Sequence, residues 1–176
     1  MMTSMTKKAV YTGSFNPITN GHMDIIRQSL SFVDELVIAM GYHSYKDINF
    51  ISIQDRSELI MQSINDLLPE HLTKISVFPF KGLAVDCVRN ISAKVIIRGL
   101  RNVTDFDYEM GMAFINRSLL PEVPTITLFA NESSHYISST LVRHLFLIGE
   151  DITPFVPYPV ACFLKDNYKK IKEGSV

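Results

Sequence analysis

The chain has 176 residues, 47% of them hydrophobic, and its 17 basic and 18 acidic residues leave a formal net charge of −1. This length and composition fit a domain with a real hydrophobic core, and they exclude a disordered chain. The absence of a long block of lysine and arginine excludes an extended electrostatic groove for nucleic acid. No stretch approaches the roughly 20 apolar residues of a membrane span, so we expect a cytoplasmic protein that binds neither nucleic acid nor a membrane.

Two cysteines, Cys87 and Cys162, lie far apart in the chain. They have no CxxC spacing and no neighbouring histidine pattern, so neither a protein metal site nor a disulfide framework is indicated. Both are expected to be core thiols of a reducing compartment.

Five short apolar segments rich in β-branched and aromatic residues predict strands, at residues 8–13, 35–41, 74–80, 94–99 and 125–130. Helical patterns follow the first four, at residues 22–32, 52–68, 83–92 and 105–119. Strands that are apolar on both faces and alternate with helices predict an α/β fold, a Rossmann-like doubly wound sheet of five parallel strands with helices on both faces.

The remainder of the chain also predicts helices. One is capped by Ser138 and closed near Gly149, and a C-terminal helical segment covers about residues 150–176. Its end, residues 165–176, is expected to be a solvated helix end. No linker, repeat or low-complexity segment divides the chain, so residues 1–176 are expected to form a single domain.

The first candidate site is the loop TGSFNPITNGH, residues 12–22, beyond the carboxyl end of the first strand. Ligands of such sheets bind at this edge. Gly13 permits a sharp turn, Gly21 permits close approach of the backbone, and a helix N-terminus with His22 in its first turn suits phosphate. Neither GxGxxG nor GxxxxGK[ST] occurs where it would be needed. For His22 alone, a capping histidine in an ordinary turn remains the alternative.

A second group, Arg98 and Arg101, flanks Gly99 and Leu100 at the end of the fourth strand. If that strand lies beside the first, both guanidinium groups face the same crevice as His22, where planar forks suit phosphate oxygens. The alternative is that they pair with acidic residues of the next helix, namely Asp105, Asp107 or Glu109. Asn116 and Arg117, further along that helix, are expected to form ion pairs or an interface.

The third group, Ser138, Ser139 and Thr140, opens a helix after the fifth strand. These hydroxyls and the backbone N–H groups of the first turn can bind phosphate oxygens, although helix capping alone would explain them. Lys46, beyond the second strand, is a candidate by its position, whereas a solvated surface lysine is its ordinary interpretation.

Taken together, these segments resemble a known family. TGSFNPITNGH resembles the T/HxGH signature of the nucleotidyltransferase superfamily, and ISSTLVR resembles its ISSTxxR-type signature. The segment RGLRNVTDFDYEMGMAFINR closely resembles the phosphopantetheine adenylyltransferase family, and the similarity extends over nearly the whole chain.

The resemblance implies transfer of AMP from ATP to 4'-phosphopantetheine, giving dephospho-coenzyme A and pyrophosphate without a covalent enzyme intermediate. It also implies Mg²⁺ bound with ATP, coenzyme A as a feedback ligand, and a homohexamer. Catalytic roles fall to His22, which would stabilise the transition state, and to Lys46 and Arg101.

The resemblance also assigns binding residues. The phosphopantetheine side falls to Ser14, Lys46 and Arg98, with the backbone near Leu83 and Ala84. The ATP side falls to Ser14, Phe15, His22, Gly99, Leu100, Arg101, Glu109, Ser134, His135, Tyr136, Ile137, Ser138, Ser139 and Thr140.

Three positions depart from the family pattern. Asn16 stands where aspartate is common, so no carboxylate is available there for magnesium. Ser134 stands where an aromatic residue is frequent, and the stretch Thr140 to Arg143 is closer to nicotinate-mononucleotide relatives. Two alternatives therefore stay open: a nicotinate-mononucleotide adenylyltransferase or other superfamily nucleotidyltransferase, and a regulatory module that binds ATP or coenzyme A without turnover.

Overall fold

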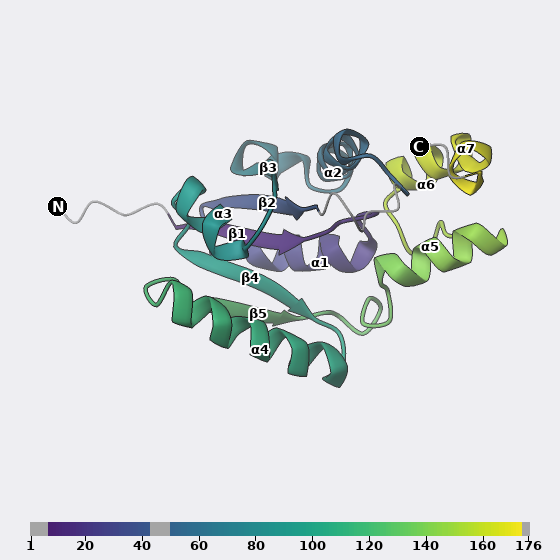
Figure 1. The fold of residues 1–176 in the computed structure, drawn as a ribbon. Helices are drawn as coiled ribbons and strands as arrows, with labels where there is room; N and C mark the ends of the chain where they lie inside the picture. Colours follow the sequence, from purple (N-terminus) through teal and green to yellow (C-terminus); the bar gives the residue numbers. More distant parts are fainter. Residues whose placement is uncertain (1–6, 43–49, 174–176) are drawn as a thin grey trace.

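A five-stranded, all-parallel sheet forms the centre of the computed structural model, which describes residues 7–42 and 50–173. Its strands are β1 (Lys8–Gly13), β2 (Glu35–Gly41), β3 (Ile75–Phe80), β4 (Val95–Leu100) and β5 (Thr125–Phe129). Their order across the sheet is β3-β2-β1-β4-β5 (Figure 1). β4 therefore lies directly beside β1, as the convergence of the two candidate loops requires.

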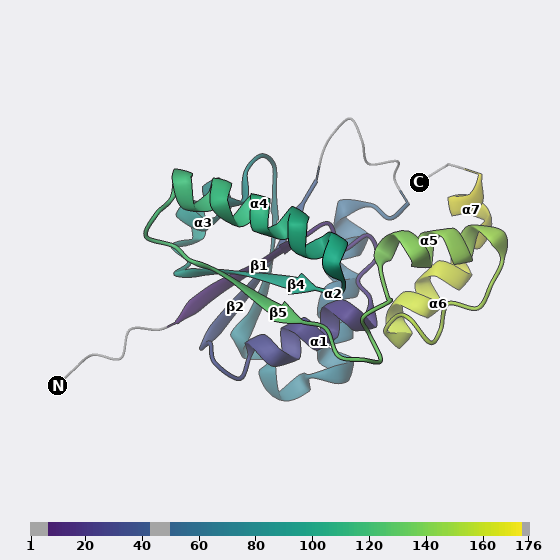
Figure 2. The same cartoon turned by 90° about the horizontal axis from the view of Figure 1, so that it is seen from below.

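Helices cover both faces of this sheet, which confirms the predicted doubly wound fold. They are α1 (Asn20–Ser29), α2 (Ile53–Leu67), the 3₁₀ helix η1 (Pro69–Lys74), α3 (Ala84–Ile91), α4 (Val103–Leu119), α5 (Ser139–Ile148), α6 (Tyr158–Asp166) and α7 (Tyr168–Lys172). Figure 2 shows α1 and α2 on one face, α3 and α4 on the other, and α5 to α7 beyond the strand ends. Among these elements, none combines the length and the apolar character that crossing a bilayer requires.

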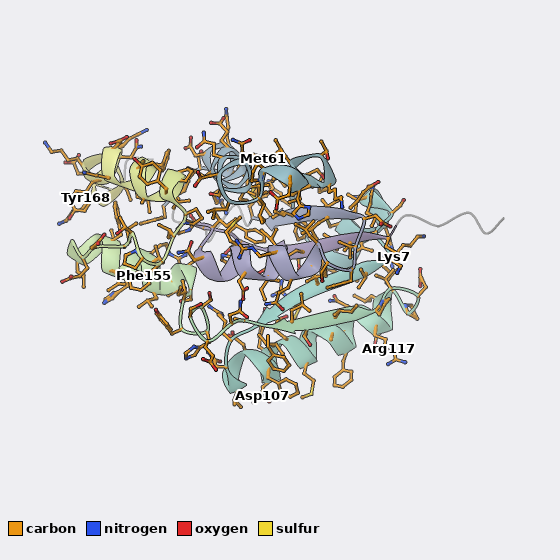
Figure 3. All side chains as sticks on the ribbon, turned by 180° about the vertical axis from the view of Figure 1, so that it is seen from behind. Lys7, Met61, Asp107, Arg117, Phe155 and Tyr168 are labelled. Carbon is orange, nitrogen blue, oxygen red and sulfur yellow. The ribbon has the colours of Figure 1, made fainter. Side chains whose placement is uncertain are left out.

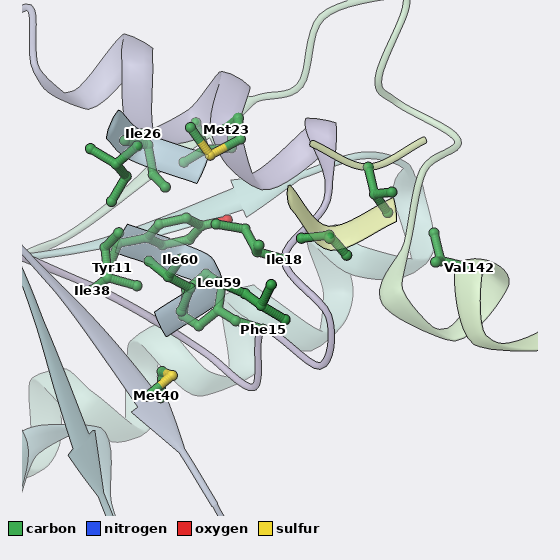
Figure 4. Packing of buried hydrophobic residues seen from close by; sticks show 14 of the residues in the cluster. Tyr11, Phe15, Ile18, Met23, Ile26, Ile38, Met40, Leu59, Ile60 and Val142 are labelled. Carbon is green, nitrogen blue, oxygen red and sulfur yellow. The ribbon is translucent and has the colours of Figure 1, made fainter. Parts of the chain in front are cut away.

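Side chains alternate between the two faces along each strand, because the side-chain period of a strand is two. Val10 and Val37 join the smaller core under α3 and α4, whereas Tyr11 and Ile38 join the larger core under α1 and α2. In Figure 4, Tyr11 and Ile38 lie close to Ile26 of α1 and to other side chains of this larger core. Both faces of the central strands are thus dry, which rigidly positions the loops that follow them.

The C-terminal helices belong to the same core. α5 is capped by Ser138 and ends at Gly149, whose φ of +89° is the left-handed conformation that glycine adopts readily, as predicted. The segment after it is divided into α6 and α7 at Asn167. Ile171 is buried and the ring of Tyr168 packs on Phe146 at 5.1 Å, so the prediction of a solvated helix end is wrong for these two residues.

α4 leaves much of its apolar surface exposed. Phe114 is 63% exposed, and Phe129 at the end of the edge strand β5 is 75% exposed. The polar residues Asp107 and Arg117 lie on α4 near the molecular edge (Figure 3). We call one set of exposed side chains the α4/β5 surface: Val103, Phe106, Met110, Phe114, Ile115, Leu119, Ile126 and Phe129.

Candidate active site

Two adjoining cavities lie at the carboxyl ends of β1 and β4, where the strand order changes direction and ligands of such folds bind. The first cavity, of about 260 Å³, lies between the start of α1 and the start of α5. The second, of about 270 Å³, extends toward β3, α3 and α4. They share four lining residues, Thr12, Gly13, Ser14 and Arg98.

Most of the predicted site residues meet at these cavities. Those at the first cavity are Ser14, His22, Arg98, Gly99, Arg101, Glu109, Ile137, Ser138, Ser139 and Thr140. Ser14, Ala84 and Arg98 line the second cavity. Lys46 lies outside the described residues.

His22 is fixed by a reciprocal cap at the N-terminus of α1. The Thr19 backbone N–H donates to His22 Nδ1 at 3.0 Å, and the Thr19 hydroxyl oxygen accepts from the His22 backbone N–H. Because Nδ1 accepts this hydrogen bond, the proton of the neutral ring resides on Nε2. His22 therefore caps α1 and lines the first cavity in the same conformation, so the two interpretations of this residue are compatible.

Desolvation of the imidazole by the surrounding protein lowers the pKa of His22 to about 3, and the positive charges of Arg101 and Arg98 lower it as well. The ring lines the first cavity. At neutral pH His22 is thus an uncharged hydrogen-bond donor and not an imidazolium.

Phe15 supports His22 from within the core. Its side chain is fully buried, and its ring meets the His22 ring edge-on at 5.0 Å and the Tyr11 ring at 5.2 Å. Its φ of +46° is unusual for a residue other than glycine. Phe15, predicted to bind ATP, lines neither cavity. It contributes by fixing the loop and the ring of His22.

Arg98 is held between the two cavities. Its Nε and Nη2 donate to the two carboxylate oxygens of Glu109 at 2.6 and 2.5 Å, and Nη1 donates to the backbone oxygen and the hydroxyl of Thr12. This bidentate pair confirms the ion pairing weighed for Arg98. The guanidinium group is immobilised and still borders both cavities.

Arg101 pairs with Asp105 in the same manner, through Nε at 2.7 Å and Nη2 at 3.1 Å. Its Nη1 donates to the backbone oxygen of Ile137 at 3.4 Å. Arg101 therefore joins the start of α4 to the segment before α5, across the first cavity. Asp107, the third acidic candidate, is an exposed residue of α4.

The start of α5 uses its hydroxyls to hold the site together. Ser138 caps the helix through the Leu141 N–H, and Ser139 Oγ donates to the Pro17 backbone oxygen at 2.8 Å. The first-turn N–H groups of α5 lie at the wall of the first cavity, where a helix N-terminus favours an anion.

Besides Phe15, four predicted ATP-binding residues do not line the two cavities: Leu100, Ser134, His135 and Tyr136. Leu100 and Ser134 are buried, and the rings of His135 and Tyr136 form an edge-on pair on the outer side of the segment before α5.

Sequence reasoning gave no site role to several polar residues that line the two cavities, Asn116 and Tyr11 among them. Asn116, expected in an ion pair or interface, is only 5% exposed and lines the second cavity. It follows Glu109 by seven residues, which places both on one face of α4, and this spacing could have identified it. Tyr11 lines the first cavity, and burial raises the pKa of its hydroxyl well above the ordinary value.

The fold is that of a nucleotidyltransferase, as comparison with known proteins shows. The family model described as Cytidylyltransferase-like matches residues 10–145, a span that contains both cavities. Among solved structures, the nicotinic acid mononucleotide adenylyltransferase of Plasmodium falciparum is similar, with a TM-score of 0.67 at 14% identity, covering 95% of this chain and 98% of that one. At this identity the similarity establishes the fold alone.

Two curated relatives are more similar in sequence. The phosphopantetheine adenylyltransferase of Methylocella silvestris is 46% identical over 165 residues, which cover 94% of this chain and 98% of the relative. The enzyme of the same name from Brucella suis is 42% identical over 161 residues, covering 92% and 98%. The chain belongs to the phosphopantetheine adenylyltransferase family.

Proposed function

We propose that this protein transfers AMP from ATP to 4'-phosphopantetheine, forming dephospho-coenzyme A and pyrophosphate, the activity that its relatives' name describes. The observation that carries this proposal is the pair of adjoining cavities with a common wall at Ser14 and Arg98. One cavity can hold the nucleotide and the other the pantetheine arm, so the two reacting phosphates meet at the shared wall.

The chemistry asks for positioning and charge stabilisation. A phosphate oxygen of 4'-phosphopantetheine attacks the α-phosphorus of ATP, and the bond to the bridging oxygen breaks as pyrophosphate leaves with its electron pair. Holding two polyanions in line lowers the barrier, and donors aimed at the α-phosphate lower it further by stabilising the charge that develops there. We assign this donor role to the Nε2–H of His22, which needs no protonation change because the ring is neutral.

The other residues bind the two polyanions. Arg101 and the N-terminus of α5 would hold the triphosphate, since both border the first cavity. Arg98 and Ser14, at the shared wall, would contact the incoming phosphate, with Lys46 assigned to the same phosphate by resemblance.

Magnesium would enter with ATP. Within residues 7–42 and 50–173, no group of three or more histidine, cysteine, aspartate or glutamate side chains is placed to hold a metal. The triphosphate and water would therefore supply most of its ligands, as is usual for Mg²⁺. Asn16 Oδ1 is buried without a hydrogen-bond partner, but Asn16 lines neither cavity, so we assign it no part in holding the ion.

Coenzyme A is proposed as a feedback ligand because it combines an adenosine half with a pantetheine arm. Such a molecule can occupy both cavities at once and so compete with both substrates.

A homohexamer is proposed from the family resemblance, and the α4/β5 surface supports an interface between copies because it is more apolar than a solvated helix and edge strand require. Sedimentation should give six times the 20.0 kDa monomer mass. Phe114→Glu should dissociate the assembly, whereas the control Asp107→Asn on the same helix should leave it intact. A monomeric wild type would overturn this assignment.

The deciding experiment is pyrophosphate release by the purified protein with ATP and Mg²⁺, run in parallel with 4'-phosphopantetheine and with nicotinate mononucleotide. Release with phosphopantetheine alone is expected. Release only with the nicotinate acceptor would transfer the assignment to that branch, and ATP binding without release in either assay would indicate a regulatory module.

A second experiment tests His22. We expect His22→Ala to lower kcat by roughly 10²- to 10³-fold, as loss of a transition-state donor does, while ATP affinity changes much less. His144→Ala, an exposed histidine of α5, is the matched control and should retain full turnover. Unchanged turnover of His22→Ala would remove His22 from the mechanism.

A further inference from the structure

A buried carboxylate in α1, Asp24, takes no part in the mechanism described above. It follows His22 by two residues, and it is only 5% exposed. A buried carboxylate is costly unless it is hydrogen-bonded, so its partners indicate what it does.

The partners of Asp24 lie mainly in the segment that leaves the sheet after β5. Asp24 Oδ2 accepts from the Asn131 backbone N–H at 2.9 Å, and Oδ1 accepts from the Asn131 side-chain amide at 2.5 Å. Gln28, one turn later on α1, donates to the same carboxylate at 3.1 Å and to the Phe129 backbone oxygen at 3.0 Å. Asp24 therefore fixes the first residues after β5 onto α1.

Residues 131–138 then run from this anchor to the cap of α5. Short hydrogen bonds stiffen the segment, from Ser134 N to Asn131 O at 2.8 Å and from Ile137 N to Ser134 O at 3.0 Å. A Cβ placed on Gly21 would come within 3.4 Å of the Ile137 oxygen and 3.5 Å of the Ser134 oxygen. The backbone of the segment thus packs directly on the start of α1.

The far end of the segment is held by site residues, through Arg101 to Ile137 O and Ser139 to Pro17 O. Ile137 and the first turn of α5 line the first cavity. The position of this wall relative to His22 is consequently set at one end by Asp24 and at the other by the site itself.

We propose that Asp24 is a positioning residue for nucleotide binding, which acts through Asn131 to hold residues 131–138 and the N-terminus of α5 at the distance from His22 that ATP requires. This inference rests on the proposed function only in naming the nucleotide as ATP. It assigns no contact between Asp24 and either substrate.

The test compares the Michaelis constants of the two substrates in single and exchanged variants. Asn131→Ala removes the side-chain partner at an exposed position, so the fold tolerates it. Asp24→Asn removes the charge, and the double variant Asp24→Asn/Asn131→Asp exchanges carboxylate and amide while keeping a hydrogen bond between the two side chains.

Each single variant should raise KM for ATP about tenfold, the effect of losing one hydrogen bond to a charged group. KM for phosphopantetheine should stay within about twofold, and the exchanged pair should recover most of the ATP affinity. Asp34→Asn, an exposed carboxylate bonded to the Lys7 N–H before β1, is the control and should behave as wild type.

Several outcomes overturn the proposal. These are an unchanged KM for ATP in Asn131→Ala, equal rises in KM for both substrates, or no recovery in a folded exchanged variant. The dissociation constant for ATP, measured by calorimetry on the same variants, tests the role of Asp24 independently of the proposed transfer of AMP. A wild type that binds ATP and releases no pyrophosphate refutes the proposed function, while a loss of ATP binding in Asn131→Ala still supports the role of Asp24.

Discussion

The half-buried, neutral His22 should make the stability of the protein depend on pH, and replacing His22 should remove this dependence. In the unfolded chain the imidazole takes up a proton as the pH falls below its ordinary pKa of 6.5, whereas in the native state it stays neutral until the pH approaches 3. The unfolded state therefore binds more protons throughout this window. Native stability contributed by His22 is complete above pH 6.5 and is lost progressively as the pH falls toward 3.

The size of this effect follows from the displaced pKa. At pH 5 the ordinary pKa lies 1.5 units above the solution pH, which corresponds to about 2 kcal/mol of lost stability. For a domain of this length, that loss lowers the melting temperature by about 4–8 °C.

The measurement is thermal unfolding followed by circular dichroism between pH 7.5 and 5.0, at constant ionic strength and without nucleotide. His22→Asn is the informative variant because its side-chain oxygen can still accept the Thr19 N–H but cannot titrate. Wild type should lose about 4–8 °C more than His22→Asn over this range, and His144→Ala should follow wild type. Parallel pH curves for wild type and His22→Asn would refute a histidine that stays neutral in the native state down to acidic pH.

The remaining predictions concern packing and phosphate recognition. Gly99→Ala should lower the free energy of unfolding by about 1–3 kcal/mol, because its Cβ would meet Ile25 at 2.9 Å. Gly111→Ala should raise the free energy of unfolding by about 0.5–1 kcal/mol, because apart from the adjacent residues and the backbone of α4 no atom of the described residues lies within 4 Å of the added carbon. Urea titration measures both changes. Arg98→Lys and Lys46→Ala should each raise KM for phosphopantetheine more than KM for ATP, and the opposite pattern would show that the two sides of the site are inverted.

The sheet could be predicted from sequence because each strand is a short apolar segment bounded by polar or turn residues. Helix boundaries differ more from the prediction. α4 begins at Val103, two residues before the predicted start, because Asn102 caps it through the Asp105 N–H. The 3₁₀ helix from Pro69 to Lys74 was missed, since so short an element has no periodic pattern.

The candidate site was predictable to the extent that its motifs follow strands. Arg98 and His22 converge because β4 lies beside β1, and parallel strands present all their carboxyl ends at one edge. What each side chain contacts could not be predicted, because that depends on packing between segments distant in the chain. Phe15 is in the core, Asn116 reaches the second cavity from α4, and Asp24 binds Asn131, a partner 107 residues away.

The common wall of the two cavities has a consequence for inhibitor design. Under the proposed assignment of one substrate to each cavity, a compound confined to either cavity would compete with one substrate, and a rising concentration of that substrate would displace it. A compound that links a group in each cavity across Ser14 and Arg98 would gain the effective concentration of a tethered pair. Glu109 and Thr12 hold the guanidinium group of Arg98 in one position. The linker must therefore fit around a fixed group, and the shape of the linker is the property to optimise first.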